Sequence, residues 1–334
     1  MTIQSAHSLS LFEQSSKNAI QGNFEGRCRA FFRKTSAFLL AMLLIGGFLI
    51  SAHADGPAIS TDYAQAMQQA TREGKLLLIA FHDSPDASPL EVLFQQVANT
   101  AEGAKQLDRH VVAILPTSFL CATVATSTVE TTDAAKESKP PAATRLLDHP
   151  AFAEMLQRPG LAVLDFTNPK GRHFHYVISV LPLPAGSVPT LEHTLVMLGL
   201  PHGSLTQRSV IFAIRTHPSR PQSTAGEFSP ILADEVESHA QHQANINLQG
   251  HHQWESRFHR INAKLPAGLV AIEVCAESWP GQTMMESARE LVHSWSQSPG
   301  HWGAVSAYQP QYGYDMKRGS NGVWYGNGIF GRAR

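Results

Sequence analysis

Cysteine and charged residues are scarce in this sequence. Three cysteines occur among 334 residues, and none belongs to a CxxC, a CxxH or another cysteine-based metal pattern. Lys, Arg, Asp and Glu make up 16% of the chain and leave a formal net charge of −1. Because the sequence has no basic field, we expect neither nucleic acid nor an anionic membrane surface as the main partner.

The N-terminal apolar run is short for a transmembrane helix. It covers residues 37–50, about 14 residues, whereas a span needs roughly 20. Basic residues precede it, and Ser51-Ala-His-Ala54 follows it with the small residues of a signal-peptide cleavage site. We predict a cleaved signal peptide over residues 1–54. The alternative is a retained anchor, which would make the membrane a partner. Either outcome places the rest of the chain outside the cytoplasm, as a secreted, periplasmic or cell-surface protein.

The cysteines are therefore interpreted in an oxidising compartment. Cys28 would be removed with the signal peptide, which leaves Cys121 and Cys275. A disulfide between these two would join the two halves of the chain. Two separate buried thiols are the favoured interpretation.

The length allows two domains of ordinary size. Residues 57–200 alternate helix and strand signals, and the continuous apolar run at 75–81 is typical of a buried strand. Residues 122–143, rich in Thr, Ala, Ser and Pro, are expected to form a surface insertion. The expected elements are helices at 63–72, 90–107, 152–156 and 190–198 and strands at 75–81, 111–115, 161–166 and 173–180.

The order of these elements resembles that of a thioredoxin-like domain, and Arg158-Pro-Gly160 is similar to the segment before that family's third strand. The redox dithiol of the family would fall within residues 81–89, which contain no cysteine. Disulfide exchange needs one thiolate to attack and another to resolve. We therefore predict that residues 57–200 are a redox-inactive scaffold or binding module.

Two motifs after a Pro- and Gly-containing boundary at 199–204 carry a second resemblance. Glu273-Val-Cys-Ala276 and Trp295-Ser-Gln-Ser-Pro-Gly-His301 resemble the Glu-x-x-Ala and Trp-x-x-Ser-Pro-Gly-His elements of the CAP superfamily (cysteine-rich secretory, antigen 5 and pathogenesis-related proteins). The resemblance covers residues 203–334 and implies a three-layer α-β-α sandwich, with its first two helices at 208–220 and 228–247. The predicted fold class is α/β in two domains, a thioredoxin-like domain followed by a CAP-type sandwich.

The CAP resemblance also implies a site. In that superfamily two histidines, often with two acids, meet in a cleft that binds a divalent metal in several members. The matching positions here are Glu273 for the first acid and His301 for the second histidine. The first histidine is His251 or His252, and we choose His251 as the metal ligand beside His301. Ser298 stands in the place of the second acid. Spacing selects no substitute among Glu277, Glu286 and Glu290.

The residue types permit two functions. Two neutral imidazoles and one carboxylate could hold Zn²⁺ or another divalent cation with an open position for water, although no HExxH-type spacing is present. Ser298 is more simply a helix-end residue than a nucleophile, and we assign no catalytic residue. The sequence favours an extracellular binding module for a lipid, glycan or protein ligand that it does not identify. A metal-assisted, peptidase-like hydrolase is the alternative, and a structural envelope role is third.

Overall fold

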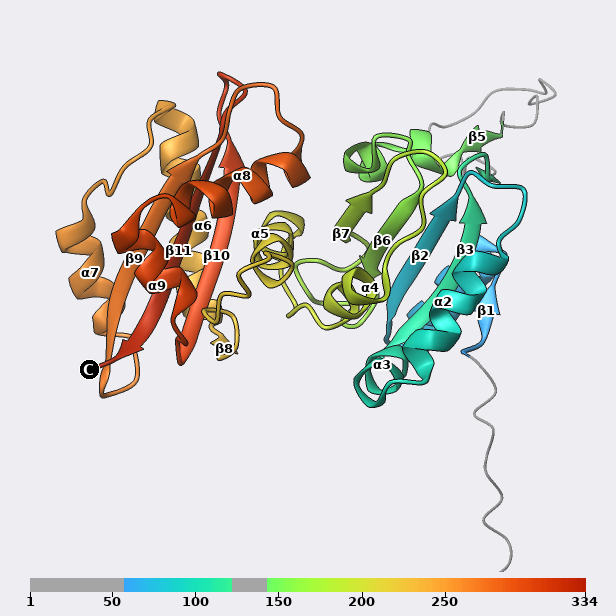
Figure 1. Cartoon of the computed structure of the whole chain (residues 1–334), viewed down its shortest axis with the longest axis horizontal. Helices are drawn as coiled ribbons and strands as arrows, with labels where there is room; N and C mark the ends of the chain where they lie inside the picture. The colour runs from blue at the N-terminus through green and yellow to red at the C-terminus, as the bar shows by residue number, and fades with distance from the viewer. Residues whose placement is uncertain (1–56, 122–142) are drawn as a thin grey trace, which may run out of the picture. The chain divides into compact units, whose positions relative to one another are not determined.

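The structure is a computed structural model that describes residues 57–121 and 143–334 (Figure 1). It is a mixed α/β fold with two main sheets. The predicted signal peptide and nearly all of the predicted insertion lie outside the described residues. Within the described ranges, no helix is both long and apolar enough to cross a membrane. Cys121 and Cys275 are free thiols, as the interpretation of separate thiols expects, but Cys121 is only half-buried.

The first sheet has five strands in the order β1-β3-β2-β6-β7. β2 pairs with β3 in parallel and with β6 in antiparallel register, and β6 continues antiparallel to β7. All residues of β2 except the last are buried, which explains its continuous apolar run. The strands are β1 (Ile59–Ser60), β2 (Leu76–His82), β3 (His110–Pro116), β6 (Gly160–Asp165) and β7 (Val177–Pro182), and a separate ribbon pairs β4 (Leu120–Cys121) with β5 (Thr144–Arg145).

Three of the predicted elements in this part were wrong in detail. The expected helix at 90–107 is two helices, because the Thr100 side chain accepts the Gly103 N–H and starts a new helix there. The expected helix near 152–156 is a 3-10 helix. The last strand begins at Val177, since His173–Tyr176 forms a turn. The helices are α1 (Tyr63–Glu73), α2 (Ser88–Ala98), α3 (Ala101–Leu107), η1 (Leu146–Asp148), η2 (Pro150–Met155) and α4 (Leu191–Leu198).

The second sheet has four strands in the order β8-β10-β11-β9, with helices on both faces. Alternate residues of β9 divide between two apolar clusters: Ala271 packs with residues of α6 and α7, and Val274 packs with residues of α8. The elements are α5 (Leu205–Arg215), β8 (Glu227–Phe228), α6 (Pro230–Ile246), α7 (Trp254–Asn262), β9 (Leu269–Glu277), α8 (Met284–Ser296), α9 (Pro299–Ser306), β10 (Gln311–Arg318) and β11 (Trp324–Ala333).

Gly313 allows α6 to approach the sheet closely. A Cβ atom at this position of β10 would lie 2.5 Å from the backbone nitrogen of Ala233 and 2.6 Å from the carbonyl carbon of Leu232. Only glycine leaves room for that contact. The close packing places the α6 side chains directly over β10 and β11.

The fully buried guanidinium of Arg208 connects α5 to the first sheet. It donates to the Ser179 hydroxyl on β7 and to the carbonyls of Met197, Leu200 and Pro201 at distances of 3.3, 3.1 and 2.8 Å. Burial, and then the charge of Arg215, lower its pKa to about 9, so the group stays charged at pH 7. One apolar cluster runs from the first sheet through α5 to the second. The predicted boundary near residue 200 stays a prediction.

Replacing Arg208 with Met should lower the free energy of unfolding by at least about 3 kcal/mol, because the Ser179 hydroxyl and three carbonyls, two of them in buried bonds, lose their donor. Chemical denaturation followed by circular dichroism measures the change. Arg289→Met, at an exposed position of α8, is the control and should change stability by less than about 0.5 kcal/mol. Equal stability of the two variants would show that the guanidinium is dispensable.

Candidate functional site

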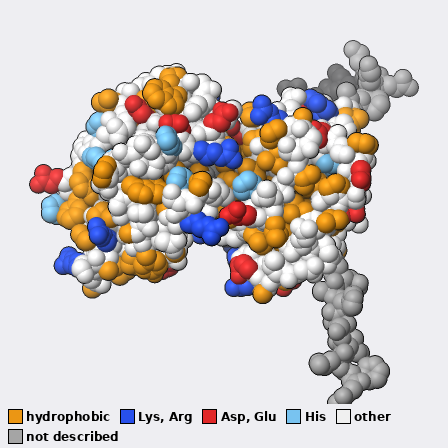
Figure 2. All heavy atoms as spheres, in the orientation of Figure 1, with side chains coloured by type: hydrophobic (Ala, Val, Ile, Leu, Met, Phe, Trp, Pro, Cys, Tyr) orange, Lys and Arg blue, Asp and Glu red, His pale blue; other side chains and the backbone are white. Residues whose placement is uncertain are grey.

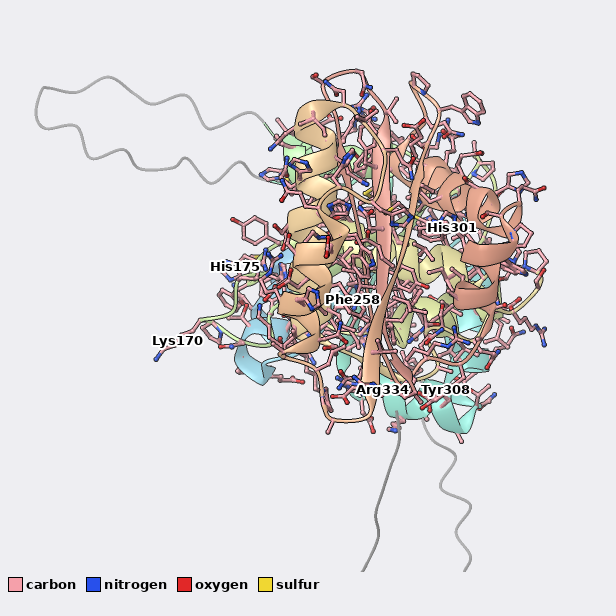
Figure 3. The ribbon with its side chains drawn as sticks, turned by 90° about the vertical axis from the view of Figure 1, so that its left-hand side faces the viewer. Lys170, His175, Phe258, His301, Tyr308 and Arg334 are labelled. Atoms are coloured by element: carbon pink, nitrogen blue, oxygen red, sulfur yellow. The ribbon has the colours of Figure 1, made fainter. Side chains whose placement is uncertain are left out.

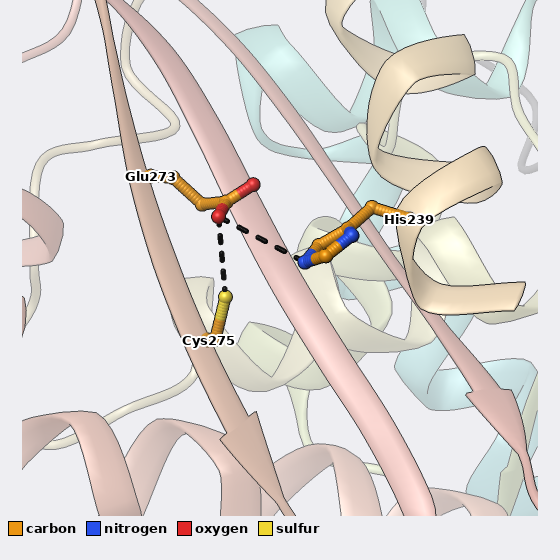
Figure 4. Close-up of side chains that lie close together, drawn as sticks. All are labelled: His239, Glu273 and Cys275. Carbon is orange, nitrogen blue, oxygen red and sulfur yellow. Dashed lines mark hydrogen bonds and ion pairs between the residues drawn. The ribbon is translucent and has the colours of Figure 1, made fainter. Parts of the chain in front are cut away.

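Glu273 lies at the centre of the candidate site. It is the fifth residue of β9, and its side chain is 1% exposed. Because successive strand residues point to opposite faces, Glu273 and Cys275 lie on one face of β9, toward His239 of α6 (Figure 4). The strand thus delivers a carboxylate and a thiol into a protein interior.

Four groups surround the Glu273 carboxylate. His251 Nδ1 donates to Oε1 over 2.9 Å, and the Arg257 guanidinium of α7 donates to Oε2. The Cys275 thiol lies 3.5 Å from Oε1, and the His239 ring is the fourth group. Burial tends to raise the pKa of Glu273, but the bonds from His251 and Arg257 outweigh it and hold that pKa below its usual range. The carboxylate is therefore ionised at neutral pH and neutralised by Arg257.

His239 completes the buried part of the site. Its Nε2 lies 3.0 Å from the Gly250 carbonyl and 3.8 Å from Glu273 Oε1. Burial lowers the pKa of His239 to about 4, against the attraction of Glu273, so the ring is neutral. The Gln243 amide also donates to Gly250 O, over 2.7 Å. Two donors from α6 therefore fix the backbone directly before His251.

His239, Glu273 and Cys275 are close enough to be considered as metal ligands. Their polar atoms lie within 4.8 Å of one another, and the part of the chain that the structure describes holds no other group of this kind. Their chemistry fits a metal poorly. His239 Nε2 donates to a carbonyl and so has no lone pair to offer, Arg257 already neutralises Glu273, and burial raises the pKa of the Cys275 thiol far above its usual range. The hydrogen bonds of these residues instead hold His251 and the Gly250 carbonyl in place.

The accessible part of the site is a pair of imidazoles. A carboxylate only accepts hydrogen bonds, so His251 Nδ1 carries the proton and Nε2 keeps its lone pair. The His251 side chain is 43% exposed, and its ring centre lies 5.8 Å from that of His301 on α9. In Figure 3, His301 and Phe258 of α7 lie on opposite sides of β9. Burial, and then His251, lower the pKa of His301, which favours its neutral, ligating form.

The structure brings together three of the four residues that the sequence predicted for this site, His251, Glu273 and His301. His252 is placed differently: its Nε2 is 3.3 Å from the Leu248 carbonyl, and its ring centre is 5.6 Å from that of His242 and 6.2 Å from that of His239. His251 is thus the histidine that contacts Glu273 and lies near His301, and its choice as a metal ligand stays a prediction.

Of the residues considered for the second acid, two lie at helix starts and one at the end of a strand. Ser298 is the N-cap residue of α9, as a helix-end position requires, but its hydroxyl makes no capping bond, contrary to expectation. Glu286 forms the capping box of α8 with Thr283. Glu277 is exposed at the end of β9. The charged residue that contacts Glu273 is therefore not a second acid but the base Arg257.

Three residues of the site were missed by sequence reasoning, namely His239, Arg257 and Cys275. Strand alternation was the available signal for Cys275, since it follows Glu273 by two residues. Helical spacing was the signal for His239 and Gln243, which are four residues apart on α6. Nothing in the sequence indicated that Arg257 would reach Glu273, because their contact depends on how α7 packs against β9.

The buried neutral state of His239 predicts a pH-dependent loss of stability. The unfolded chain binds a proton near pH 6.5 and the folded chain near pH 4, so stability is fully present above pH 6.5 and falls as the pH drops toward 4. When the pH is lowered from 7.5 to 5, the free energy of unfolding should decrease by about 2 kcal/mol less in His239→Gln than in the wild type. Urea unfolding at both pH values measures it. The matched control is His242→Gln on the same helix, and an equal loss in wild type and His239→Gln would contradict the assignment.

Comparison with known proteins gives little information about this chain. No family model matches the sequence, and no curated protein matches it. Among solved structures, an outer surface protein of Borrelia burgdorferi is similar over 33% of this chain and 78% of its own, with 16% identity and a TM-score of 0.27. A likeness at that level carries no argument about fold or function.

Proposed function

We propose that residues 203–334 form a CAP-like binding module that acts outside the cytoplasm and holds a divalent cation, with Zn²⁺ as the best match, between His251 and His301. The observation that carries the proposal is the pair of imidazoles 5.8 Å apart, one of which is oriented by the buried Glu273 carboxylate. The ligand that the module recognises is a lipid, glycan or protein, and the proposed cation site is part of that recognition surface.

Pairing of a carboxylate with a histidine supports a metal role. Metal-ligating histidines commonly donate their second ring N–H to a carboxylate, which fixes the tautomer and raises the basicity of the ligating nitrogen. Two imidazoles on one tetrahedral Zn²⁺, with Zn–N bonds of about 2.1 Å, have ring centres about 5 Å apart. The separation of His251 and His301 is close to this value, and water would complete the coordination.

The arrangement of both sheets supports the proposed family assignments. Helices on both faces of the second sheet agree with the α-β-α sandwich expected of a CAP-like domain. In the first sheet, a parallel β2–β3 pair extended by antiparallel β6 and β7 agrees with a thioredoxin-like domain. The loop between β2 and α2 carries no thiol, so we propose that this domain is a redox-inactive scaffold.

Binding is favoured over hydrolysis by the state of Glu273. A metal-assisted hydrolase needs a base that is free to take a proton from the attacking water. Both carboxylate oxygens of Glu273 already accept hydrogen bonds, from His251 and from Arg257. The hydrolase alternative would therefore need a base other than Glu273.

His301→Ala should weaken Zn²⁺ binding at least tenfold, because one of two ligating nitrogens is removed. Glu273→Gln should also weaken it about tenfold, through loss of the bond that orients His251. Affinity should fall on acidification, because a protonated imidazole has no lone pair to offer a metal. Calorimetric titration of the full chain with Zn²⁺ measures all three effects.

His252→Ala provides the matched control, since His252 neighbours His251 in sequence but its ring lies beside those of His239 and His242. It should change the Zn²⁺ affinity by less than a factor of about two to three. Unchanged affinity in His301→Ala would show that the pair does not bind the metal. Zn²⁺-dependent cleavage of peptides that is lost in His301→Ala would favour the hydrolase.

A further inference from the structure

A second buried carboxylate holds a second exposed histidine, at the end of β6. Asp165 is the last residue of that strand and is fully buried. Its Oδ1 accepts from the backbone N–H and the hydroxyl of Thr167, over 2.8 and 2.6 Å, and its Oδ2 accepts from His202 Nε2 over 2.6 Å. Burial tends to raise the pKa of Asp165, but the bonds from Thr167 and His202 lower it below its usual range. The ionised carboxylate therefore fixes the proton of His202 on Nε2 and leaves Nδ1 with a lone pair.

The loop that carries His202 is fixed from inside the protein. Arg208 donates to the carbonyls of Leu200 and Pro201, the two residues that precede His202. The His202 side chain itself is 50% exposed. Asp165 thus fixes the ring of His202 through Nε2, and Arg208 fixes the backbone just before it. Half of the side chain stays accessible to solvent.

His173 supplies a second imidazole beside the first. Its loop is closed onto β6 by two backbone bonds, from His175 N–H to the Asp165 carbonyl and from Asp165 N–H to the Tyr176 carbonyl, over 2.7 and 3.1 Å. Figure 3 labels His175 in this loop. The ring centres of His173 and His202 lie 5.5 Å apart. His173 also lines a surface hollow of about 390 Å³, so a small ion can reach it from solvent.

Charged groups of both signs lie around this pair, among them the buried Arg208, which interacts with Asp165. Arg172, the nearest exposed guanidinium in sequence, is paired with Glu237 over 2.8 Å and lies 3.6 Å from Asp234. Asp165 contributes a negative charge directly behind His202. Burial, then His202 and Arg172, lower the pKa of His173, which keeps its ring neutral and able to ligate. On the face drawn in Figure 2, basic and acidic side chains are intermingled.

We propose that His173 and His202 bind a divalent transition-metal ion of the Zn²⁺ type, with Asp165 as the buried acceptor that orients His202. The ring separation is close to the value of about 5 Å expected for two imidazoles on one tetrahedral ion. As at His251, a buried carboxylate accepts a hydrogen bond from one of the two imidazoles and orients it for a metal. The site uses no residue of the His251–His301 pair, so it stands whether or not that pair binds metal.

The experiment uses the full chain carrying His251→Ala and His301→Ala, which removes the first pair of imidazoles. Calorimetric titration of this double variant with Zn²⁺ at about pH 7.5, where free imidazole is neutral, should detect one bound ion. Adding His173→Ala should weaken that binding at least tenfold, because one of the two ligating imidazoles is removed. The substitution leaves the bond between Asp165 and His202 in place. His202→Gln should have the same effect, since the amide still donates to Asp165 but does not replace an imidazole as ligand.

His193→Ala is the matched control, a half-buried histidine on α4 that belongs to neither pair, and it should leave the affinity unchanged. Circular dichroism establishes that each variant is folded. Absence of a bound ion in the double variant, or equal affinity with and without His173, would overturn the proposal.

Discussion

The buried guanidinium of Arg208 is the interaction on which the arrangement of this protein depends. A charged group removed from water must have every donor satisfied, and Arg208 finds its acceptors in the Ser179 hydroxyl and in three carbonyls at and after the end of α4. Because Arg208 lies on α5, these bonds join the helix that opens the second half of the chain to the last strand of the first sheet. They also fix the loop that carries His202. The same guanidinium therefore positions α5 against the first sheet and supports the second candidate site.

Both candidate sites are built in the same physical way. A strand delivers a carboxylate into the interior, Glu273 on β9 and Asp165 at the end of β6, and hydrogen bonds keep it ionised there. Each carboxylate then fixes the tautomer of one exposed histidine, and a second imidazole lies 5.8 or 5.5 Å away. The difference is Arg257, which neutralises Glu273 directly. Asp165 instead accepts its side-chain hydrogen bonds from Thr167 and His202, and the buried Arg208 interacts with it through charge alone.

Strong local patterns in the sequence predicted most of the first sheet correctly. The apolar run of β2 and the periodicity of α1 can be recognised from residues that lie close together in the sequence. The break between α2 and α3 was missed because a helical apolar pattern continues across Thr100, and the capping hydroxyl decides the outcome. The start of β7 was also missed. His173–Tyr176 has strand-like composition, but its backbone bonds return to Asp165.

The sequence by itself determined the α/β class, the absence of a dithiol after β2, and three histidine and glutamate positions that the fold brings together. Only the tertiary structure decided what each of those groups does. The partners of Glu273 come from β9, α6, α7 and the loop after α6. Those of Asp165 come from residues up to 37 positions away. Hydrogen bonds of this kind depend on how elements pack, and packing has no local signature in the chain.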